Sequence, residues 1–139
     1  MAVFFPFEVH TPYRLFYSAS VEAIILTLID GDVGVYANHT AFTAPVLSCI
    51  LSIKEKDGNW KKAFIAEGLL EVKNHKTVLI SEAAEWPEEI DLERARAAKE
   101  QAETTLAEGT FKFEKESVIS SLRRAKMRIK AVEEGLKKS

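Results

Sequence analysis

The sequence predicts an α+β protein in which an N-terminal antiparallel β-sandwich is followed by a C-terminal antiparallel two-helix hairpin. In the first part of the chain, short runs of Val, Ile, Leu and Phe are separated by turn residues, which is typical of strands. After Trp86-Pro87, residues 88–138 contain no proline and follow a helical period. A length of 139 residues suits one small domain with an appendage. We therefore expect a β-sandwich domain at 1–86 and a helical domain at 87–139.

Eight strands are expected in the first domain, at 3–9, 15–17, 20–29, 33–36, 46–53, 60–66, 69–73 and 76–81. Asp57-Gly58 indicates a hairpin turn, because this pair readily adopts positive φ, and Asn74-His75 is a weaker signal of the same kind. No helical pattern separates the strands, which favours an antiparallel sandwich over a parallel sheet. The run Ile24-Ile25-Leu26 is apolar on both faces, so we expect this strand to lie mid-sheet or to have its outer face covered.

The first helix is expected to begin at Pro87, since proline suits the first turn of a helix. Glu88, Glu89 and Asp91 follow it, and their charges suit the positive end of the helix dipole. Gly109 is the expected C-cap, and residues 110–113 are the expected connection to the second helix. The small and apolar residues at helical spacing are Ala95, Ala98, Ala102 and Leu106.

The second helix carries a seam of apolar residues spaced alternately four and three apart: Val118, Leu122, Ala125, Ile129, Val132 and Leu136. Two helices joined by a short loop fold back as an antiparallel hairpin. Alanine dominates the seam of the first helix, and an alanine contact contributes well under the ~1.5–3 kcal/mol of a buried leucine. We therefore expect a weakly held hairpin beside a firmly held sandwich.

Charge and composition exclude several classes of protein. The chain has 19 Lys and Arg against 21 Asp and Glu, a net charge of −2, so bulk attraction to nucleic acid or to an anionic membrane is not expected. The one cysteine, Cys49, excludes an intramolecular disulfide and fits a reducing compartment. The longest apolar run, at 23–29, is far shorter than the ~20 residues of a membrane span, and the N-terminus has no features of a signal or transit peptide. We expect a soluble protein.

No catalytic residue and no metal site are predicted. His10, His39 and His75 are far apart and match no metal-ligand spacing. Cys49 lies within an apolar run, where a buried and inert thiol is expected. The two glycines at 31–34 lack the lysine and the following helix of a phosphate loop, so we expect a turn between strands there.

Residues 123–130 form a basic run with five cationic side chains in eight positions. The segment 112–139 holds nine basic and four acidic residues, a net charge of +5 in a chain that is acidic overall. One interpretation is a solvated helix face paired with acidic residues of the first helix. The other is a docking surface for a negatively charged partner or for phosphates, since Arg124 and Arg128 lie on one side of the helix and could share a polyphosphate. Nucleic acid is disfavoured, because the hairpin lacks the third helix of a major-groove reader and the run has no aromatic residue for stacking.

Three groups of short motifs occur in order along the chain. They are Gly31-Asp32-Val33-Gly34-Val35-Tyr36 with Asn38-His39, Glu67-Gly68-Leu69-Leu70-Glu71-Val72 with Val78-Leu79-Ile80, and Ile90-Asp91-Leu92-Glu93-Arg94-Ala95. In this order and spacing, the chain resembles the epsilon subunits of bacterial and chloroplast F-type ATP synthases, the counterparts of the mitochondrial delta subunit, over essentially its whole length. It departs from that family at Ala37 and Ala41, where proline is usual, and near Cys49 and at Glu67, where glycine is frequent.

The resemblance implies a non-catalytic subunit in the central stalk of a proton-translocating ATP synthase. The sandwich would bind the gamma subunit and sit on the c-ring, so that rotation reaches the catalytic head. Gly31, Asp32 and Val33 would meet the c-ring, and His39 would lie near gamma. The alternatives are a solvated turn carboxylate for Asp32 and a structural turn histidine for His39. The chain would lie peripherally at the cytoplasmic face of the bacterial cell membrane, or at a plastid thylakoid, and would meet the membrane only through the complex.

The resemblance also implies a regulator. The hairpin would be compact in one state and extended along gamma in the other, where its basic helix would contact the alpha and beta subunits and block ATP hydrolysis. The residues expected in this inhibitory contact are Arg123, Arg124, Lys126, Arg128 and Lys130. No cofactor is required, but several bacterial members of the family bind ATP as a regulatory ligand in the compact state.

The positions that match the ATP-binding motif of the family are Glu85, Ile90, Asp91, Arg94, Ala95, Arg124 and Arg128. The resemblance implies that the arginines bind phosphates, while Asp91 and Glu85 contact adenine and ribose. Gln101 stands where some nucleotide binders have a further arginine, which removes one phosphate contact. The alternative role of Asp91 is to cap the first helix and to pair with Arg94.

Two other functions stay open at this point. One is a stand-alone ATP-sensing adaptor module of the same fold, which would not co-purify with alpha, beta and gamma subunits. The other is a small enzyme that uses His39 with Asp32, which would require turnover by the isolated chain.

Overall fold

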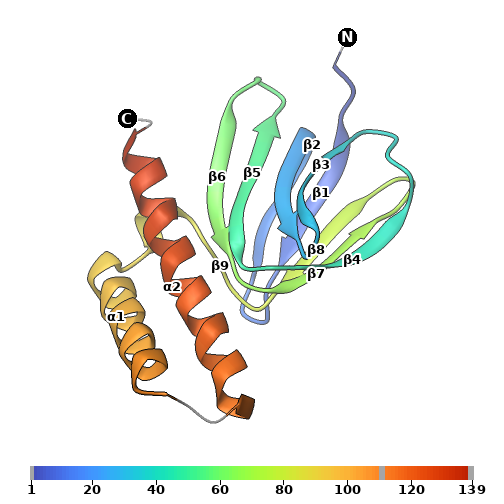
Figure 1. Cartoon of the computed structure of the whole chain (residues 1–139). Helices are drawn as coiled ribbons and strands as arrows, with labels where there is room; N and C mark the ends of the chain where they lie inside the picture. The colour runs from blue at the N-terminus through green and yellow to red at the C-terminus, as the bar shows by residue number, and fades with distance from the viewer. Residues whose placement is uncertain (1, 110–111, 138–139) are drawn as a thin grey trace.

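The computed structural model describes residues 2–109 and 112–137. Within these residues a β-sandwich is followed by two helices that lie together beside it (Figure 1). The strands are β1 (Phe5–His10), β2 (Leu15–Leu28), β3 (Gly31–Tyr36), β4 (Phe42–Val46), β5 (Cys49–Glu55), β6 (Trp60–Ile65), β7 (Gly68–Val72), β8 (Thr77–Ser81) and β9 (Ala84–Glu85). The 3₁₀ turn η1 (Pro87–Glu89) and the helices α1 (Leu92–Glu108) and α2 (Lys112–Lys137) follow. The predicted fold class is confirmed.

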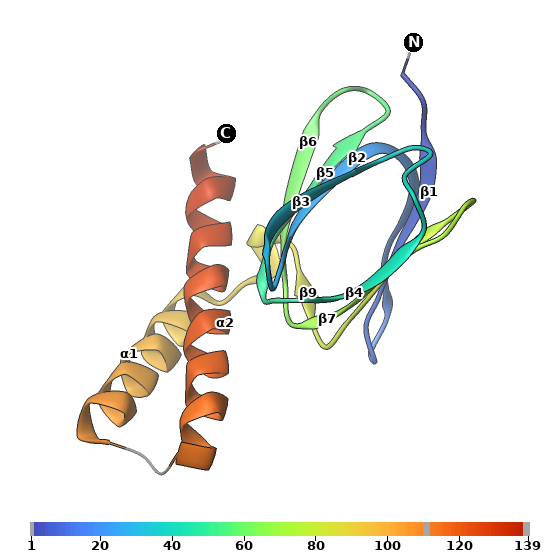
Figure 2. The same ribbon diagram turned by 45° about the vertical axis from the view of Figure 1, so that its right-hand side comes forward.

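The strands form one sheet that closes on itself, so that in Figure 2 they surround an oval interior. Hydrogen-bonded neighbours follow the order β1-β8-β7-β4-β2-β5-β6-β9, and β2 also pairs with β3 and β1. The described pairs are antiparallel, as predicted, except that β1 and β8 are parallel. The parallel pair forms because β1 pairs with β2 along one edge and offers its other edge to β8, whose direction is set by its hairpin with β7.

Strand β2 runs unbroken through the position where the sequence predicts a gap between 15–17 and 20–29. The small and polar residues at 18–20 favour a break, but they pair with residues 6–8 of β1. Backbone pairing with a neighbouring strand outweighs weak β-propensity in such a segment. The first half of β2 therefore pairs with β1 and the second half with β3 and β5.

The strand predicted at 46–53 corresponds to β5, but β5 begins later, at Cys49, because Val46 still belongs to β4, a strand that the sequence analysis missed. Pro45 weakens the strand signal of β4. The strand tolerates this proline because β4 pairs along its length only with β7 and meets β2 at Val46 alone, so most of its other edge needs no backbone donor. Strand β9 was not predicted, because it has only two residues; it pairs with β6 and places Glu85 at the edge of the sandwich.

Both predicted hairpin turns are confirmed. Gly58 has a φ of 85°, the positive value that the Asp57-Gly58 pair indicates. The N–H of Glu55 donates to the carbonyl of Asn59 at 2.9 Å across this turn. At the second turn, between β7 and β8, the N–H of Lys73 donates to the carbonyl of residue 76 at 2.9 Å.

The core of the sandwich consists of fully buried apolar side chains: Phe7, Val9, Ile24, Leu26, Leu51, Ile53, Leu70 and Leu79. Between Ile24 and Leu26, Ile25 is only partly buried and lines a groove beside α2 together with Ile50 of β5. Ile24 and Ile25 pair with β3 on one edge and with β5 on the other, so the mid-sheet alternative for this doubly apolar strand is confirmed.

Helix α1 begins at Leu92, and the predicted start at Pro87 is wrong. Residues 87–89 form η1, and Ile90 is extended, with φ −82° and ψ 129°. Asp91 is the N-cap, because its Oδ1 accepts a hydrogen bond from the N–H of Arg94 at 3.1 Å. The fixed φ of proline suits a 3₁₀ turn as well as an α-helix, so Asp91, which can cap, decides where the α-helix starts.

Helix α1 ends at the predicted C-cap, Gly109, which has a φ of 82°. On its predicted seam, Ala95 and Ala102 are buried, whereas Ala98 is exposed. Of the connection predicted at 110–113, residues 110 and 111 lie outside the described residues, and α2 has already begun at residue 112.

Helix α2 lies between α1 and the sandwich and has a second buried face that the sequence analysis missed (Figures 1 and 2). Ala131 is fully buried against Phe64 and Ala66, and Met127 packs beside them. On the predicted seam, Ala125 is buried, while Val118, Leu122, Ile129 and Val132 are partly buried. The side chain of Leu136 lies outside the described residues.

Candidate functional site

A cleft of about 480 Å³ lies where α1, α2 and the segment that joins them to the sandwich meet. It is lined by Glu85, Glu89, Asp91, Arg94, Ala95, Ala98, Ser121, Arg124, Ala125 and Arg128. Its volume falls in the range of ~300–1,000 Å³ that is common for small-molecule sites. The structure thus brings together six of the seven residues predicted to bind ATP. The seventh, Ile90, does not line the cleft but packs with Phe64 and Ala66 against the sandwich.

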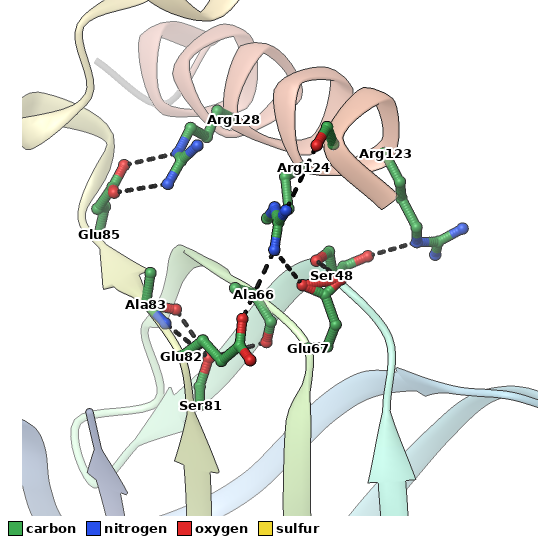
Figure 3. A network of polar contacts seen from close by, with 11 residues as sticks. Ser48, Ala66, Glu67, Ser81, Glu82, Ala83, Glu85, Arg123, Arg124 and Arg128 are labelled. Carbon is green, nitrogen blue, oxygen red and sulfur yellow. Dashed lines mark hydrogen bonds and ion pairs between the residues drawn. The ribbon is translucent and has the colours of Figure 1, made fainter. Parts of the chain in front are cut away.

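Arg128 of α2 and Glu85 of β9 form a two-point ion pair in this cleft (Figure 3). Nε of Arg128 donates to Oε1 of Glu85 and Nη2 donates to Oε2, both at 3.1 Å. The guanidinium carbon lies 4.6 Å from the centroid of the Phe64 ring, which adds a cation–π contact. Glu85 therefore orients the edge of the guanidinium, and the Phe64 ring lies against its face.

The two preceding arginines of α2 reach the turns at one end of the sandwich (Figure 3). Nη1 of Arg124 lies 2.7 Å from Oε1 of Glu67 and 3.6 Å from Oε2 of Glu82. Nε of Arg123 donates to the backbone carbonyl of Ser48 at 2.7 Å. These contacts attach α2 to the turns that follow β4, β6 and β8.

The basic run is not paired with acidic residues of α1, as one interpretation of the sequence expected. In the described part of the chain, the hydrogen bonds and ion pairs of Arg123, Arg124 and Arg128 with other elements all go to the sandwich. The reason is the position of α2, which places these side chains over the ends of the strands. Lys126 and Lys130 are exposed.

The charges that line the cleft are balanced. Three arginines, Arg94, Arg124 and Arg128, line it together with three acidic residues, Glu85, Glu89 and Asp91, and three alanines and Ser121 complete the lining. The capping role of Asp91 is confirmed, because its carboxylate accepts from the backbone N–H of Arg94. The ion pair between Asp91 and the Arg94 guanidinium is not formed in the described structure. A polyanionic ligand would find three arginines there, two of which already have carboxylate partners.

Glu89 lines the cleft, although the sequence predicted only a dipole role for it. Its Oε1 accepts hydrogen bonds from Nη2 of Arg14 at 2.8 Å and from the N–H of Trp86 at 2.9 Å. The hydrogen bond from the Arg14 side chain and, to a smaller extent, the one from the backbone N–H of Trp86 hold the pKa of Glu89 below its usual value of 4.5. Glu89 stands three residues after Trp86, where a glutamate can accept from the preceding backbone N–H, but Trp86 is not a capping residue and no local signal places Glu89 in the cleft. Ser121 and Ala98 also line the cleft and were not predicted.

The residues predicted to contact the c-ring and gamma lie at the two ends of β3. Gly31, Asp32 and Val33 begin the strand, and Oγ1 of Thr27 donates to Oδ1 of Asp32 at 2.5 Å. His39 follows the other end of the strand and is exposed. At a rise of about 3.3 Å per residue, the five steps from Gly31 to Tyr36 separate the two ends of β3 by roughly 17 Å. The structure thus places Asp32 and His39 at opposite ends of β3 and shows no contact between them in its described residues.

The described residues, 2–109 and 112–137, contain no group of three or more His, Cys, Asp and Glu side chains that could hold a metal ion. His10 lies 2.8 Å from Oε1 of Glu8 instead. Cys49 is buried, as predicted, and burial raises the pKa of its thiol. Over the same residues, no helix has the length and apolar character needed to cross a membrane.

The sequence matches two domains of one family. Residues 4–87 match the beta-sandwich domain of the ATP synthase delta/epsilon chain, and residues 88–133 match its long alpha-helix domain. The chain is 47% identical to the ATP synthase epsilon chain of Caldanaerobacter subterraneus subsp. tengcongensis over 127 residues, which cover 91% of each protein. It is 48% identical to the ATP synthase epsilon chain of Caldicellulosiruptor bescii over 130 residues, which cover 94% of each protein.

Two solved structures share the fold at low sequence identity. A chain in the cryo-EM structure of the Euglena gracilis mitochondrial ATP synthase aligns with a TM-score of 0.78 and 19% identity, covering 96% of this chain and 81% of that one. A chain in the central stalk and c-ring structure of the Tetrahymena thermophila mitochondrial ATP synthase aligns with a TM-score of 0.63 and 14% identity, covering 92% and 96%. The similarity in sequence extends over both the sandwich and the helices, and this chain belongs to the ATP synthase delta/epsilon chain family.

Proposed function

We propose that this chain is an epsilon-type subunit of an F-type ATP synthase, a non-catalytic part of the central stalk that couples rotation of gamma and the c-ring to ATP synthesis. The observation that carries this proposal is the similarity to epsilon chains over more than nine-tenths of both proteins. The proposal gives the chain no active site of its own.

In this proposal the sandwich is the rigid platform that contacts the rotor. Gly31, Asp32 and Val33 meet the c-ring, and His39 lies near gamma, so the two ends of β3 serve two partners. A closed sheet around a fully buried core supports such a role, because it deforms little under load. The subunit lies peripherally at the cytoplasmic face of a bacterial cell membrane, or at a thylakoid, and is held there by the complex.

The helices form the regulatory part. When the hairpin is docked, Arg123, Arg124 and Arg128 are engaged with the sandwich. Undocking would release all three arginines at once, and together with the exposed Lys126 and Lys130 they would form a basic strip. In the extended state this strip would bind acidic segments of the alpha and beta subunits and block ATP hydrolysis.

ATP is the proposed ligand of the docked state. The cleft takes Glu85 from the sandwich, Asp91 and Arg94 from the start of α1, and Arg124 and Arg128 from α2. A ligand that touches all three parts binds the docked hairpin and not the extended one, so it shifts the population toward the docked state. At a hundred times its dissociation constant, such a ligand stabilises the docked state by about 2.7 kcal/mol.

Assembly tests the subunit role against the stand-alone adaptor. The full chain is co-expressed with the alpha, beta and gamma subunits of its own enzyme, and the gamma subunit carries the affinity tag. We expect the chain to co-purify in a fixed ratio with gamma. Failure to co-purify, with the chain itself folded and still able to bind ATP, would favour the adaptor.

The inhibitory role is tested by ATP hydrolysis of the assembled complex. The complex with the full chain is compared with one whose chain ends at Asp91, which keeps the contact of Arg14 with Glu89 on the sandwich side. We expect faster hydrolysis in the truncated complex, because the basic strip is missing. Equal rates in two complexes of equal composition would contradict inhibition by the helices and would leave the stalk role unaffected.

A further inference from the structure

Glu67 competes with any anion in the cleft for one of the arginines. We propose that Glu67 is a positioning residue that sets the nucleotide affinity of this chain, by pairing with Nη1 of the cleft-lining Arg124 until a polyphosphate displaces the carboxylate. The inference rests on the nucleotide site proposed above. It adds a residue that does not line the cleft and that acts only through Arg124.

The carboxylate of Glu67 is held by donors from two elements. Oε1 accepts from Nη1 of Arg124 at 2.7 Å, and Oε2 accepts from Oγ of Ser48 at 3.1 Å. Ser48 is fully buried, and its own carbonyl accepts from Nε of Arg123 at 2.7 Å. Glu67 is therefore oriented before any ligand arrives, and two successive arginines attach α2 to the sandwich here, Arg124 to Glu67 and Arg123 to Ser48 (Figure 3).

The two arginines expected to bind phosphates differ in where their partners lie. Glu85, the partner of Arg128, lines the cleft itself, so a ligand meets this ion pair as a unit. Glu67, the partner of Arg124, is not part of the cleft lining. A phosphate that takes the Nη1–Nη2 edge of Arg124 must therefore compete with Glu67 for Nη1.

The second acidic neighbour of Arg124 cannot substitute for Glu67. Oε2 of Glu82 lies 3.6 Å from Nη1, and the Glu82 side chain is 72% exposed against 34% for Glu67. An exposed pair at this distance contributes little. Loss of the Glu67 charge consequently leaves Arg124 available for phosphate.

Two opposite effects follow from this arrangement. Without ligand, Glu67 stabilises the docked hairpin through Arg124. With ligand, the same contact has to be broken, which weakens binding. Glu67 thus lets the hairpin dock without nucleotide and raises the nucleotide concentration at which the cleft fills.

The test uses the full chain with Glu67→Gln, which keeps the size of the side chain and an oxygen to accept from Ser48. ATP binding is measured by calorimetry, and we expect the dissociation constant to fall about two- to fivefold, the value of a half-buried ion pair. Glu71→Gln is the matched control, because Glu71 lies on β7 and pairs with Lys73 at 3.4 Å, outside the cleft lining. We expect no change for it.

A double-mutant cycle separates action through Arg124 from a general effect on the turn. In an Arg124→Ala chain, Glu67→Gln should leave the dissociation constant of ATP unchanged. The same gain in both backgrounds, or no gain in either, would overturn the inference.

A readout without ligand keeps the two proposals apart. Amide hydrogen exchange of α2 near Arg124 should be faster in Glu67→Gln than in Glu71→Gln, and equal exchange would overturn the role of Glu67 as an attachment point. If the unmodified chain binds no ATP, the proposed nucleotide site is wrong, and so is the proposed effect of Glu67 on affinity. The exchange measurement still shows in that case whether Glu67 attaches α2 to the sandwich without ligand. If the unmodified chain binds ATP and Glu67→Gln binds it equally well, only the present inference is wrong.

Discussion

Nη2 of Arg14 lies 2.8 Å from Oε1 of Glu89, and this ion pair joins the turn between β1 and β2 to the segment that leads into the helices. Nη2 of Arg14 also donates to the carbonyl of Ala84 at 3.2 Å. Its guanidinium carbon lies 5.0 Å from the centroid of the Phe16 ring, and that ring stacks on Trp86 at 4.5 Å. The start of the helical part is therefore attached to the sandwich independently of α2, which is what the proposed extended state of the hairpin requires.

The Arg14–Glu89 pair should make stability depend on acid pH. The pKa of Glu89 is lowered in the folded chain, so its contribution is present above about pH 4.5 and is lost as the pH falls through the lowered value. Glu89→Gln should reduce the free energy of unfolding at pH 7 by at most about 1 kcal/mol, because the pair is partly exposed. Urea unfolding should show this difference shrinking toward pH 3. Glu88→Gln, at an exposed neighbouring position, should show no such dependence.

Gly135 should control how closely α2 approaches the start of the helical part. A Cβ at this position would lie 2.7 Å from Cβ and 3.0 Å from Cγ of Pro87. Gly135→Ala should raise the helix propensity of α2 by about 1 kcal/mol, yet loosen docking, because overpacking costs about 1–3 kcal/mol. We expect faster amide exchange in α2 with helical circular dichroism retained. Glu133→Ala, exposed on the same helix, is the control, and slower exchange in Gly135→Ala would contradict the prediction.

Gly68 is required by the close approach of β7 and β8. A Cβ there would collide with the backbone carbonyl of Ile80 and would lie 2.9 Å from Cα of Ser81. Backbone atoms of a paired strand cannot move aside cheaply, so Gly68→Ala should lower the free energy of unfolding by about 1–3 kcal/mol. Urea unfolding of the full chain measures this. Gly34→Ala should cost less, since its nearest neighbour is the exposed ring of Tyr36 at 3.3 Å.

Arg124→Ala combined with Arg128→Ala should weaken ATP binding at least about a hundredfold, since two charge-assisted contacts of about 1.5–3 kcal/mol each are removed. Calorimetry of the isolated chain measures the affinity. In the assembled complex the same double change should relieve inhibition of ATP hydrolysis, because two residues of the basic strip are lost. Lys126→Ala should relieve inhibition in part and leave ATP affinity unchanged, as Lys126 is exposed and does not line the cleft. Unchanged ATP binding in the double variant would contradict the nucleotide role.

Much of the fold follows from local patterns. Asp57-Gly58 and Asn74-His75 identify the turns that the structure has, and Gly109 identifies the end of α1. The errors lie where tertiary pairing opposes the local signal. Residues 18–20 continue β2 because β1 pairs with them, and the two residues of β9 form a strand because they pair with β6.

The sequence by itself determined that a sandwich is followed by two helices, the family, and the shared face of Arg124 and Arg128, because helical and strand periods, turn residues and motif spacing are properties of neighbouring residues. Only the tertiary structure decided which partners these side chains meet. Arg123, Arg124 and Arg128 contact Ser48, Glu67 and Glu85, which are 75, 57 and 43 residues away in the chain. Such contacts depend on where closure of the sheet places three separate turns and on which side of α2 faces them, and no local pattern carries that information.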